Sequence, residues 1–130
     1  MTMDEQGSGS PARPVAPCLD PATLDQLLSL DDGGVGLITE LLGLFEEDTP
    51  ERLAGLRSAF DRGEAVQISE LAHAMKGSAG TIGAAGMRAI ALEIEQATKG
   101  GRLDPSLPQR FQLLDEAYGE ACAALRAFIG

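Results

Sequence analysis

The segment from Leu71 to Gly83 holds the only histidine of the chain, His73, and Lys76 follows it one helical turn later. With about 100° of rotation per residue, apolar residues at positions 68, 71, 72, 75, 79 and 82 form a single stripe on a helix. His73 lies about 140° from the centre of that stripe. The pattern therefore predicts an imidazole that faces solvent, with a lysine beside it.

An exposed neutral imidazole can attack a phosphoryl donor and hold the group as a labile phosphoramidate. Lys76 would favour the neutral imidazole by charge repulsion and would then pair with the attached phosphoryl group. The simpler interpretation is a solvated surface lysine, since most such side chains make no defined interaction. The residue types and spacing are those of a reversible phosphoryl site.

Two glycines, Gly77 and Gly80, lie on the same outer face of the expected helix. Glycine inside a helix costs about 1 kcal/mol relative to alanine. One explanation is close packing against a neighbouring helix, because small residues let backbones approach. The other is that a large partner must come close to His73.

The sequence offers few of the residues that a histidine would need for metal binding or for a catalytic triad. A metal site needs several ligands, and without a second histidine or paired cysteines only carboxylates are available beside His73. Ser78 lies five residues on, on a different side of the helix, so a direct Ser-His catalytic pair is not expected. Glu70, three residues earlier, either contacts the imidazole or only covers the helix surface.

The 130-residue chain carries a formal net charge of -10, with 44% hydrophobic and 4% aromatic residues. This charge argues against nucleic acid and membrane surfaces as partners. It serves solubility or steers the protein toward a basic partner, and composition does not separate the two. The start lacks a secretory signal and no apolar run is long enough to cross a bilayer, so we expect a cytoplasmic protein. Cys18 and Cys122 make no disulfide framework or metal motif.

Residues 1–17 are rich in glycine, serine and proline, and we expect a disordered arm there, followed by one helical domain over residues 18–130. Asp20-Pro21 predicts the start of a short helix with an apolar face of four leucines, Leu24, Leu27, Leu28 and Leu30. A second apolar pattern begins near Val35. It either ends before Pro50, with Thr49 capping another helix, or continues as one helix that bends at the proline.

The histidine helix follows the turn at residues 61–64, and further helical patterns run from Met87 to Ala97 and from Pro105 or Pro108 to Phe128. Nothing in the sequence is typical of a strand. Four substantial helices joined by short turns predict an all-α fold, an antiparallel four-helix bundle with a short extra N-terminal helix.

The run from Ala72 to Ala79, with Ile82-Gly83-Ala84 after it, resembles the signature of the histidine-containing phosphotransfer (Hpt) domain family, H-x-x-K-G-S-S/A followed by Gly-Ala. The resemblance extends over roughly residues 20–129 and implies a four-helix bundle. Its exposed histidine would accept a phosphoryl group from a receiver-domain aspartate and pass it to another receiver domain.

The resemblance assigns roles to individual residues. His73 would be the phosphoacceptor, Lys76 would steady the phosphoryl group, and Gly77 would be the cleared position beside it. Two further residues, Ser78 and Gly80, match motif positions, and with Glu70 they are candidates for partner binding. Glu95 stands where family members often carry a polar residue that faces the site.

The same resemblance implies partners rather than cofactors. They are the receiver domains of response regulators and a hybrid sensor histidine kinase, and the receiver brings both the aspartate and its Mg²⁺. No ATP-binding motif is visible, so we expect a monomeric relay intermediate without autokinase activity and without a cofactor of its own. The alternative is a helical adaptor that docks a receiver or kinase domain without being phosphorylated. A small hydrolase or metal enzyme is a third hypothesis, for which ligands and a pocket are lacking.

Overall fold

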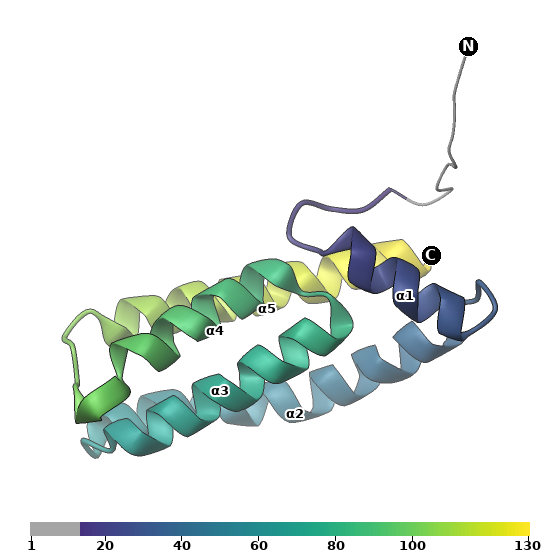
Figure 1. Cartoon of the computed structure of the whole chain (residues 1–130). Helices are drawn as coiled ribbons and strands as arrows, with labels where there is room; N and C mark the ends of the chain where they lie inside the picture. The colour runs from purple at the N-terminus through teal and green to yellow at the C-terminus, as the bar shows by residue number, and fades with distance from the viewer. Residues whose placement is uncertain (1–13) are drawn as a thin grey trace, which may run out of the picture.

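The computed structural model describes residues 14–130. Most of the expected N-terminal arm, residues 1–13, lies outside the described residues. The end of that arm belongs to the packed protein, because Val15 packs against the core. It runs along the bundle before the first helix (Figure 1).

Helix α1 spans Pro21–Leu30 and begins as the Asp20-Pro21 pair predicts. The Asp20 carboxylate accepts the backbone N–H of Ala22 at 3.1 Å, which satisfies one of the free donors at the helix start. Leu24 and Leu27 are buried, whereas Leu30, expected on the same face, is 77% exposed. Six residues turn a helix by about 600°, which leaves Leu30 about 120° away from Leu24.

Helix α2 is continuous from Gly36 to Asp61, so the structure decides between the two alternatives at Pro50. Pro50 lacks an N–H and crowds the preceding turn, which typically costs about 3 kcal/mol inside a helix. Phe45 and Leu53 are nevertheless buried in one core on either side of it. Thr49 is buried inside the helix and does not cap a second one. Tertiary packing therefore keeps both halves in one helix.

Helix α3, Ala65–Ile82, carries the histidine segment, and helix α4, Ala85–Ala97, follows after a tight turn. Gly83 makes this turn in the left-handed region, at φ +79°, where glycine is favoured. The residues before α1 fasten the turn, since Asp20 N–H donates to the Gly83 carbonyl at 2.8 Å and Gly86 N–H donates to the Cys18 carbonyl at 3.1 Å. The C-terminal end of the histidine helix is thereby anchored.

A short 3₁₀ turn, η1, covers Lys99–Gly101, and helix α5 then runs over Leu107–Ile129. Pro108 lies in the first turn of α5, where its missing N–H costs nothing. No strand occurs among residues 14–130.

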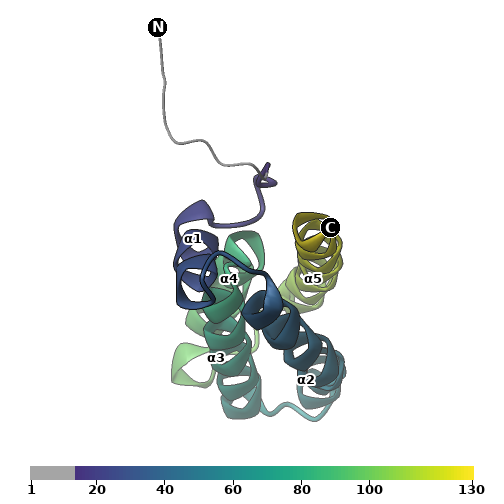
Figure 2. The same cartoon turned by 90° about the vertical axis from the view of Figure 1, so that its right-hand side faces the viewer.

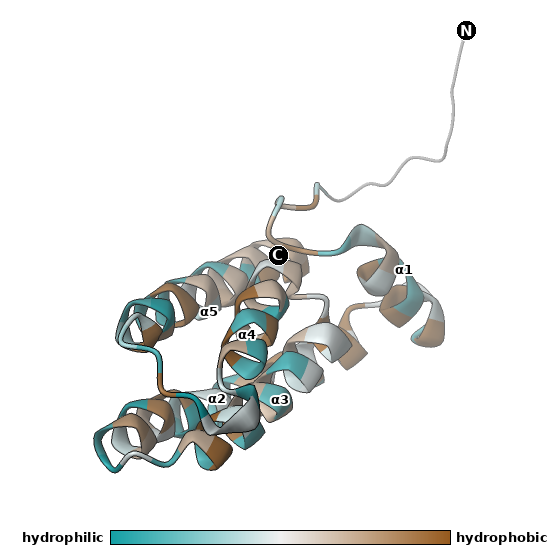
Figure 3. Ribbon diagram, turned by 60° about the vertical axis from the view of Figure 1, so that its left-hand side comes forward, coloured by the Kyte–Doolittle hydropathy of each residue, from teal (hydrophilic) through white to brown (hydrophobic). Residues whose placement is uncertain are grey.

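Helices α2, α3, α4 and α5 pack in a ring in which each contacts the next and α5 returns to α2. α1 lies across one end of the ring (Figures 1 and 2). Each helix turns an apolar stripe inward, so hydrophilic and hydrophobic residues alternate around the ribbons in Figure 3. The predicted all-α bundle with a short N-terminal helix is confirmed. Cys122 of α5 is partly buried and packs against the core of the bundle.

Candidate functional site

His73 lies on the outer side of α3, as the apolar pattern predicts. The buried residues of this helix, which form its inner stripe, are Ala65, Ile68, Ala72, Met75, Ala79 and Ile82. The side chain of His73 is 68% exposed. The imidazole therefore stands in solvent on a helix whose opposite face is held rigidly in the core.

Glu95 of α4 connects the histidine to the lysine. Its Oε2 lies 2.7 Å from His73 Nδ1, and its Oε1 accepts a hydrogen bond from Lys76 Nζ at 2.7 Å. The Glu95 side chain is only 14% exposed. One largely buried carboxylate thus bridges two side chains that are neighbours on the next helix.

Thr98, which is buried at the end of α4, stabilises the helix turn that carries Glu95. The Thr98 hydroxyl donates to the carbonyl of Ile94 at 2.9 Å and lies 3.2 Å from that of Glu95. The hydrogen bond from Lys76 lowers the pKa of Glu95, partial burial opposes this, and the bond to His73 lowers the pKa further. Glu95 is therefore an anion at neutral pH.

The charge of Glu95 defines the tautomer of the histidine. A carboxylate can only accept hydrogen bonds, so the hydrogen shared with Glu95 belongs to Nδ1 of His73. In the neutral ring the other nitrogen, Nε2, then carries the free lone pair. No described residue forms a hydrogen bond with Nε2. The arrangement presents an exposed imidazole whose orientation is set by one hydrogen bond.

Lys76 does not point freely into solvent, because it is paired with Glu95 and is 21% exposed. Its charge stabilises the carboxylate that accepts the hydrogen bond of His73. Its sequence-based role toward a phosphoryl group stays a prediction.

The two glycines have different surroundings. A Cβ atom on Gly77 would meet nothing within 4 Å, so the surface beside His73 is open there. A Cβ on Gly80 would lie 3.3 Å from Cδ and Nε of Arg88, whose side chain extends from α4 across this glycine. Gly77 thus borders open space, whereas Gly80 makes room for a side chain of the protein itself.

Ser78 and Glu70 do not join the histidine cluster. Ser78 is half-buried toward α2, lines a depression of about 200 Å³ between the two helices, and accepts a 3.4 Å hydrogen bond from Arg52 Nη1. Glu70 is exposed and forms no hydrogen bond or ion pair with any described residue. Sequence reasoning missed Arg52 and Arg88, since nothing in their spacing from His73 indicates that they reach α3.

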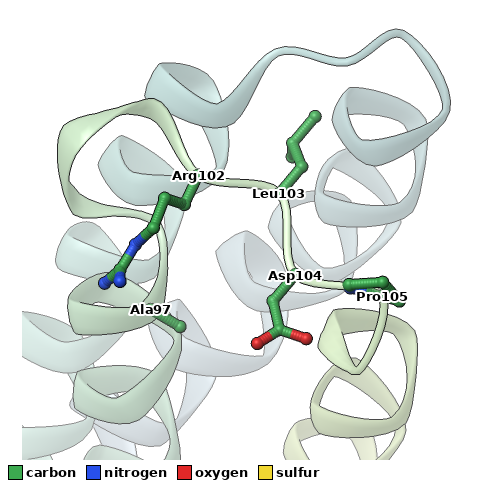
Figure 4. Close-up of a pocket in the computed structure, with 5 residues that line it drawn as sticks. All are labelled: Ala97, Arg102, Leu103, Asp104 and Pro105. Atoms are coloured by element: carbon green, nitrogen blue, oxygen red, sulfur yellow. The ribbon is translucent and has the colours of Figure 1, made fainter.

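A depression away from His73 lies between the end of α4 and the segment that leads into α5 (Figure 4). It measures about 380 Å³ and contains no predicted site residue. Its Asp104 accepts the backbone N–H of Ser106 at 2.8 Å, which lowers the pKa of that carboxyl. Asp104 thus helps the chain turn into α5.

Within residues 14–130, no three histidine, cysteine or acidic side chains come close enough together to hold a metal ion. None of the helices in the described part of the chain has the length and apolarity needed to cross a membrane.

Comparisons with known proteins agree with the geometry. The family model described as "Hpt domain" matches residues 40–127. The crystal structure of histidine-containing phosphotransfer protein B (HptB) from Pseudomonas aeruginosa PAO1 is similar, with a TM-score of 0.75 and 25% sequence identity. The alignment covers 85% of this chain and 93% of that one. A comparison with curated proteins gives no match.

Proposed function

This chain belongs to the Hpt domain family, and we propose that His73 accepts a phosphoryl group from the aspartate of one receiver domain and passes it to another. Hpt domains are phosphotransfer intermediates of two-component phosphorelays rather than kinases, and they work with receiver domains and kinases.

The observation that carries the proposal is the 2.7 Å hydrogen bond between His73 Nδ1 and Glu95 on a side chain that is 68% exposed. It supports the tautomer with hydrogen on Nδ1, in which the lone pair of Nε2 is directed away from Glu95. A group that must collect a phosphoryl group from a folded donor needs this combination of fixed orientation and access.

In the transfer step, Nε2 of His73 attacks the phosphorus of the aspartyl phosphate. The N–P bond forms while the P–O bond to the aspartate breaks, and the aspartate leaves as a carboxylate. No proton has to move, because Nδ1 keeps its hydrogen and the ring becomes a phosphorylated imidazolium. Glu95, held as an anion by Lys76, stabilises that positive charge.

The remaining residues act around this step. Lys76 offers positive charge to the phosphoryl oxygens, and Gly77 leaves the space through which the donor approaches. Ser78 and Gly80 contribute to the partner-facing surface between the helices, with Glu70 at its edge. Mg²⁺ would be held by the receiver domain, so the protein itself needs no cofactor.

We assign this chain a place between a hybrid sensor histidine kinase and a response regulator, as a cytoplasmic monomer without autokinase activity. The reaction is reversible in this scheme, because the imidazole leaves as the same neutral tautomer that attacked.

The test is phosphorylation by receiver domains charged with a small-molecule phosphodonor in the presence of Mg²⁺. We expect an acid-labile, base-stable phosphate on the wild-type protein and none on His73→Gln, with the helical content unchanged because the side chain is exposed. A label that survives the substitution would overturn the proposal. Receiver binding without any label would support the adaptor alternative instead.

A further inference from the structure

The basic side chains of residues 14–130 fall into two groups. The first group forms ion pairs with carboxylates and consists of Arg57, Arg62, Lys76, Arg110 and Arg126. The second group has no such ion pair among the described residues and consists of Arg52, Arg88, Lys99 and Arg102. A chain of net charge -10 has carboxylates in excess, so basic groups that stay unpaired are conspicuous.

Two of the unpaired arginines reach α3 from opposite neighbours. Arg52 comes from α2 and donates to Ser78 Oγ at 3.4 Å. Arg88 comes from α4, and its Cδ and Nε lie 3.3 Å from the Cβ position of Gly80. Ser78 and Gly80 are within one turn of Gly77, the open position of the site, so the two arginines approach it from either side.

Neither arginine is engaged in a strong interaction. The contact of Arg52 is long and goes to a neutral hydroxyl, which is weak compared with a guanidinium–carboxylate pair. Arg88 lines a depression of about 350 Å³ whose only carboxylate is Asp20. The Asp20 oxygens already accept hydrogen bonds from Ala22 N–H and the Thr23 hydroxyl, and no ion pair joins Asp20 to Arg88.

The positive charge of these two arginines indicates that the surface they bind is acidic. An aspartyl-phosphate donor presents carboxylates and a phosphoryl group at its reacting face, which the net charge of -10 would repel. Unpaired guanidinium groups placed at the meeting point reverse that repulsion locally, and their planar forks match carboxylates.

We propose that Arg52 and Arg88 are docking residues that bind carboxylates on the acidic face of the receiver domain, one on each side of Gly77. This inference rests on the proposed function and adds the chemistry by which the partner is recognised. Both residues act on association and orientation, and neither touches the transferred phosphoryl group.

The experiment compares three charge reversals in the full chain, Arg52→Glu, Arg88→Glu and Arg102→Glu. Arg102 is the matched control, because it is also unpaired and its reversal changes the net charge equally, but it lines the depression between α4 and α5. The readout is the second-order rate constant for phosphorylation of His73 by a receiver domain charged with acetyl phosphate, measured from low to high NaCl. Circular dichroism checks that each variant is folded.

We expect Arg52→Glu and Arg88→Glu to lower the rate constant about tenfold at low salt, with the difference shrinking at high salt, since rim charges act mainly on association. The rate at saturating receiver should change little, and Arg102→Glu should stay within about twofold of wild type. Arg88→Lys should slow phosphorylation less than Arg88→Glu does, because lysine keeps the positive charge and loses only the planar guanidinium group that can bind a carboxylate through two hydrogen bonds.

Equal rates for all three variants would overturn the inference, whether they match wild type or are slowed alike by net charge. A salt-independent loss at saturating receiver would overturn it too, since it would indicate a role in the transfer itself. These results differ from failure of the proposed function, in which the wild-type protein takes no phosphate from any receiver.

Discussion

Glu95 gives a solvent-exposed histidine a defined tautomer and orientation. An isolated imidazole exchanges between two tautomers and rotates freely, so only part of its population offers the required nitrogen. The Glu95 carboxylate, held by Lys76, favours Nδ1–H and fixes the ring. The site is therefore a three-residue unit in which the lysine acts on the histidine through the carboxylate.

The residue-scale prediction concerns Glu95→Gln. The folded pKa of Glu95 is lowered, so the carboxylate contributes stability that is present above its ordinary pKa of 4.5 and is lost as pH falls through the folded value. We expect the variant to unfold more easily than wild type at pH 7, by about 1 kcal/mol, and this difference to vanish in acid. Urea unfolding at several pH values measures it. A difference that does not depend on pH would contradict the assigned ion pair.

The same variant has a readout specific to the histidine. A neutral amide stabilises the phosphorylated imidazolium less well, so phosphorylation of His73 should slow about tenfold. The ¹⁵N shifts of the ring should report a larger population with hydrogen on Nε2. A Thr98→Val variant, which leaves the carboxylate in place, serves as the comparison for effects that come only from packing of α4.

At the scale of the element, α3 combines a rigid inner face with an open outer one. Its inner stripe is buried, and its end is fastened through Gly83 and the residues before α1. Gly77 weakens the helix without any packing contact to compensate, since a Cβ there would meet nothing within 4 Å. The cost is understandable if space above Gly77 is needed for a partner.

Gly77→Gln therefore has opposite effects on stability and activity. Helix propensity should raise the free energy of unfolding by about 0.5 kcal/mol or more, because glutamine is a better helix former than glycine. Phosphorylation of His73 by a charged receiver domain should slow at least about tenfold, because the side chain fills the approach path. Thermal unfolding and transfer assays measure the two effects.

Gly119→Gln is the matched control, since Gly119 is an exposed glycine of α5 that also has nothing within 4 Å of its Cβ position. It should stabilise the protein similarly and leave transfer unchanged. Equal transfer rates for both variants would indicate that no partner approaches at Gly77.

In the whole molecule, the helices that carry the histidine cluster differ from the helix that only supports them. All of the residues in the histidine cluster come from α3 and α4, whereas α5 contributes core residues and surface ion pairs but no residue of that cluster. Aromatic contacts join α5 to α2, with Phe45 and Tyr118 ring centroids 5.3 Å apart and those of Phe60 and Phe111 6.1 Å apart. α5 should therefore affect stability and not chemistry.

Adjacent leucines of α5 test this division. Leu114 is fully buried, so Leu114→Ala should cost about 2–5 kcal/mol of unfolding free energy, through lost burial and a cavity. Leu113 is 48% exposed, and Leu113→Ala should stay within about 0.5 kcal/mol. Both should be phosphorylated at the wild-type rate at temperatures where they are folded. Slower transfer by folded Leu114→Ala would mean that the core transmits strain to His73.

Local sequence determined the helices and the exposure of the histidine. The apolar period of α3 places His73 opposite the buried stripe, the Asp20-Pro21 pair starts α1, and Gly83 ends α3. Each depends on residues within one or two turns, where spacing alone defines which side chains share a face.

Only the tertiary structure decided which side chains from other helices meet the histidine. The register between α3 and α4 brings Glu95 to His73 and Lys76, and leaves the nearer Glu70 without a role in that cluster. Packing of both halves of α2 on one core carries the helix through Pro50, a choice that local propensity left open. Such contacts depend on how whole helices settle against one another, a long-range energy that no short stretch of sequence contains.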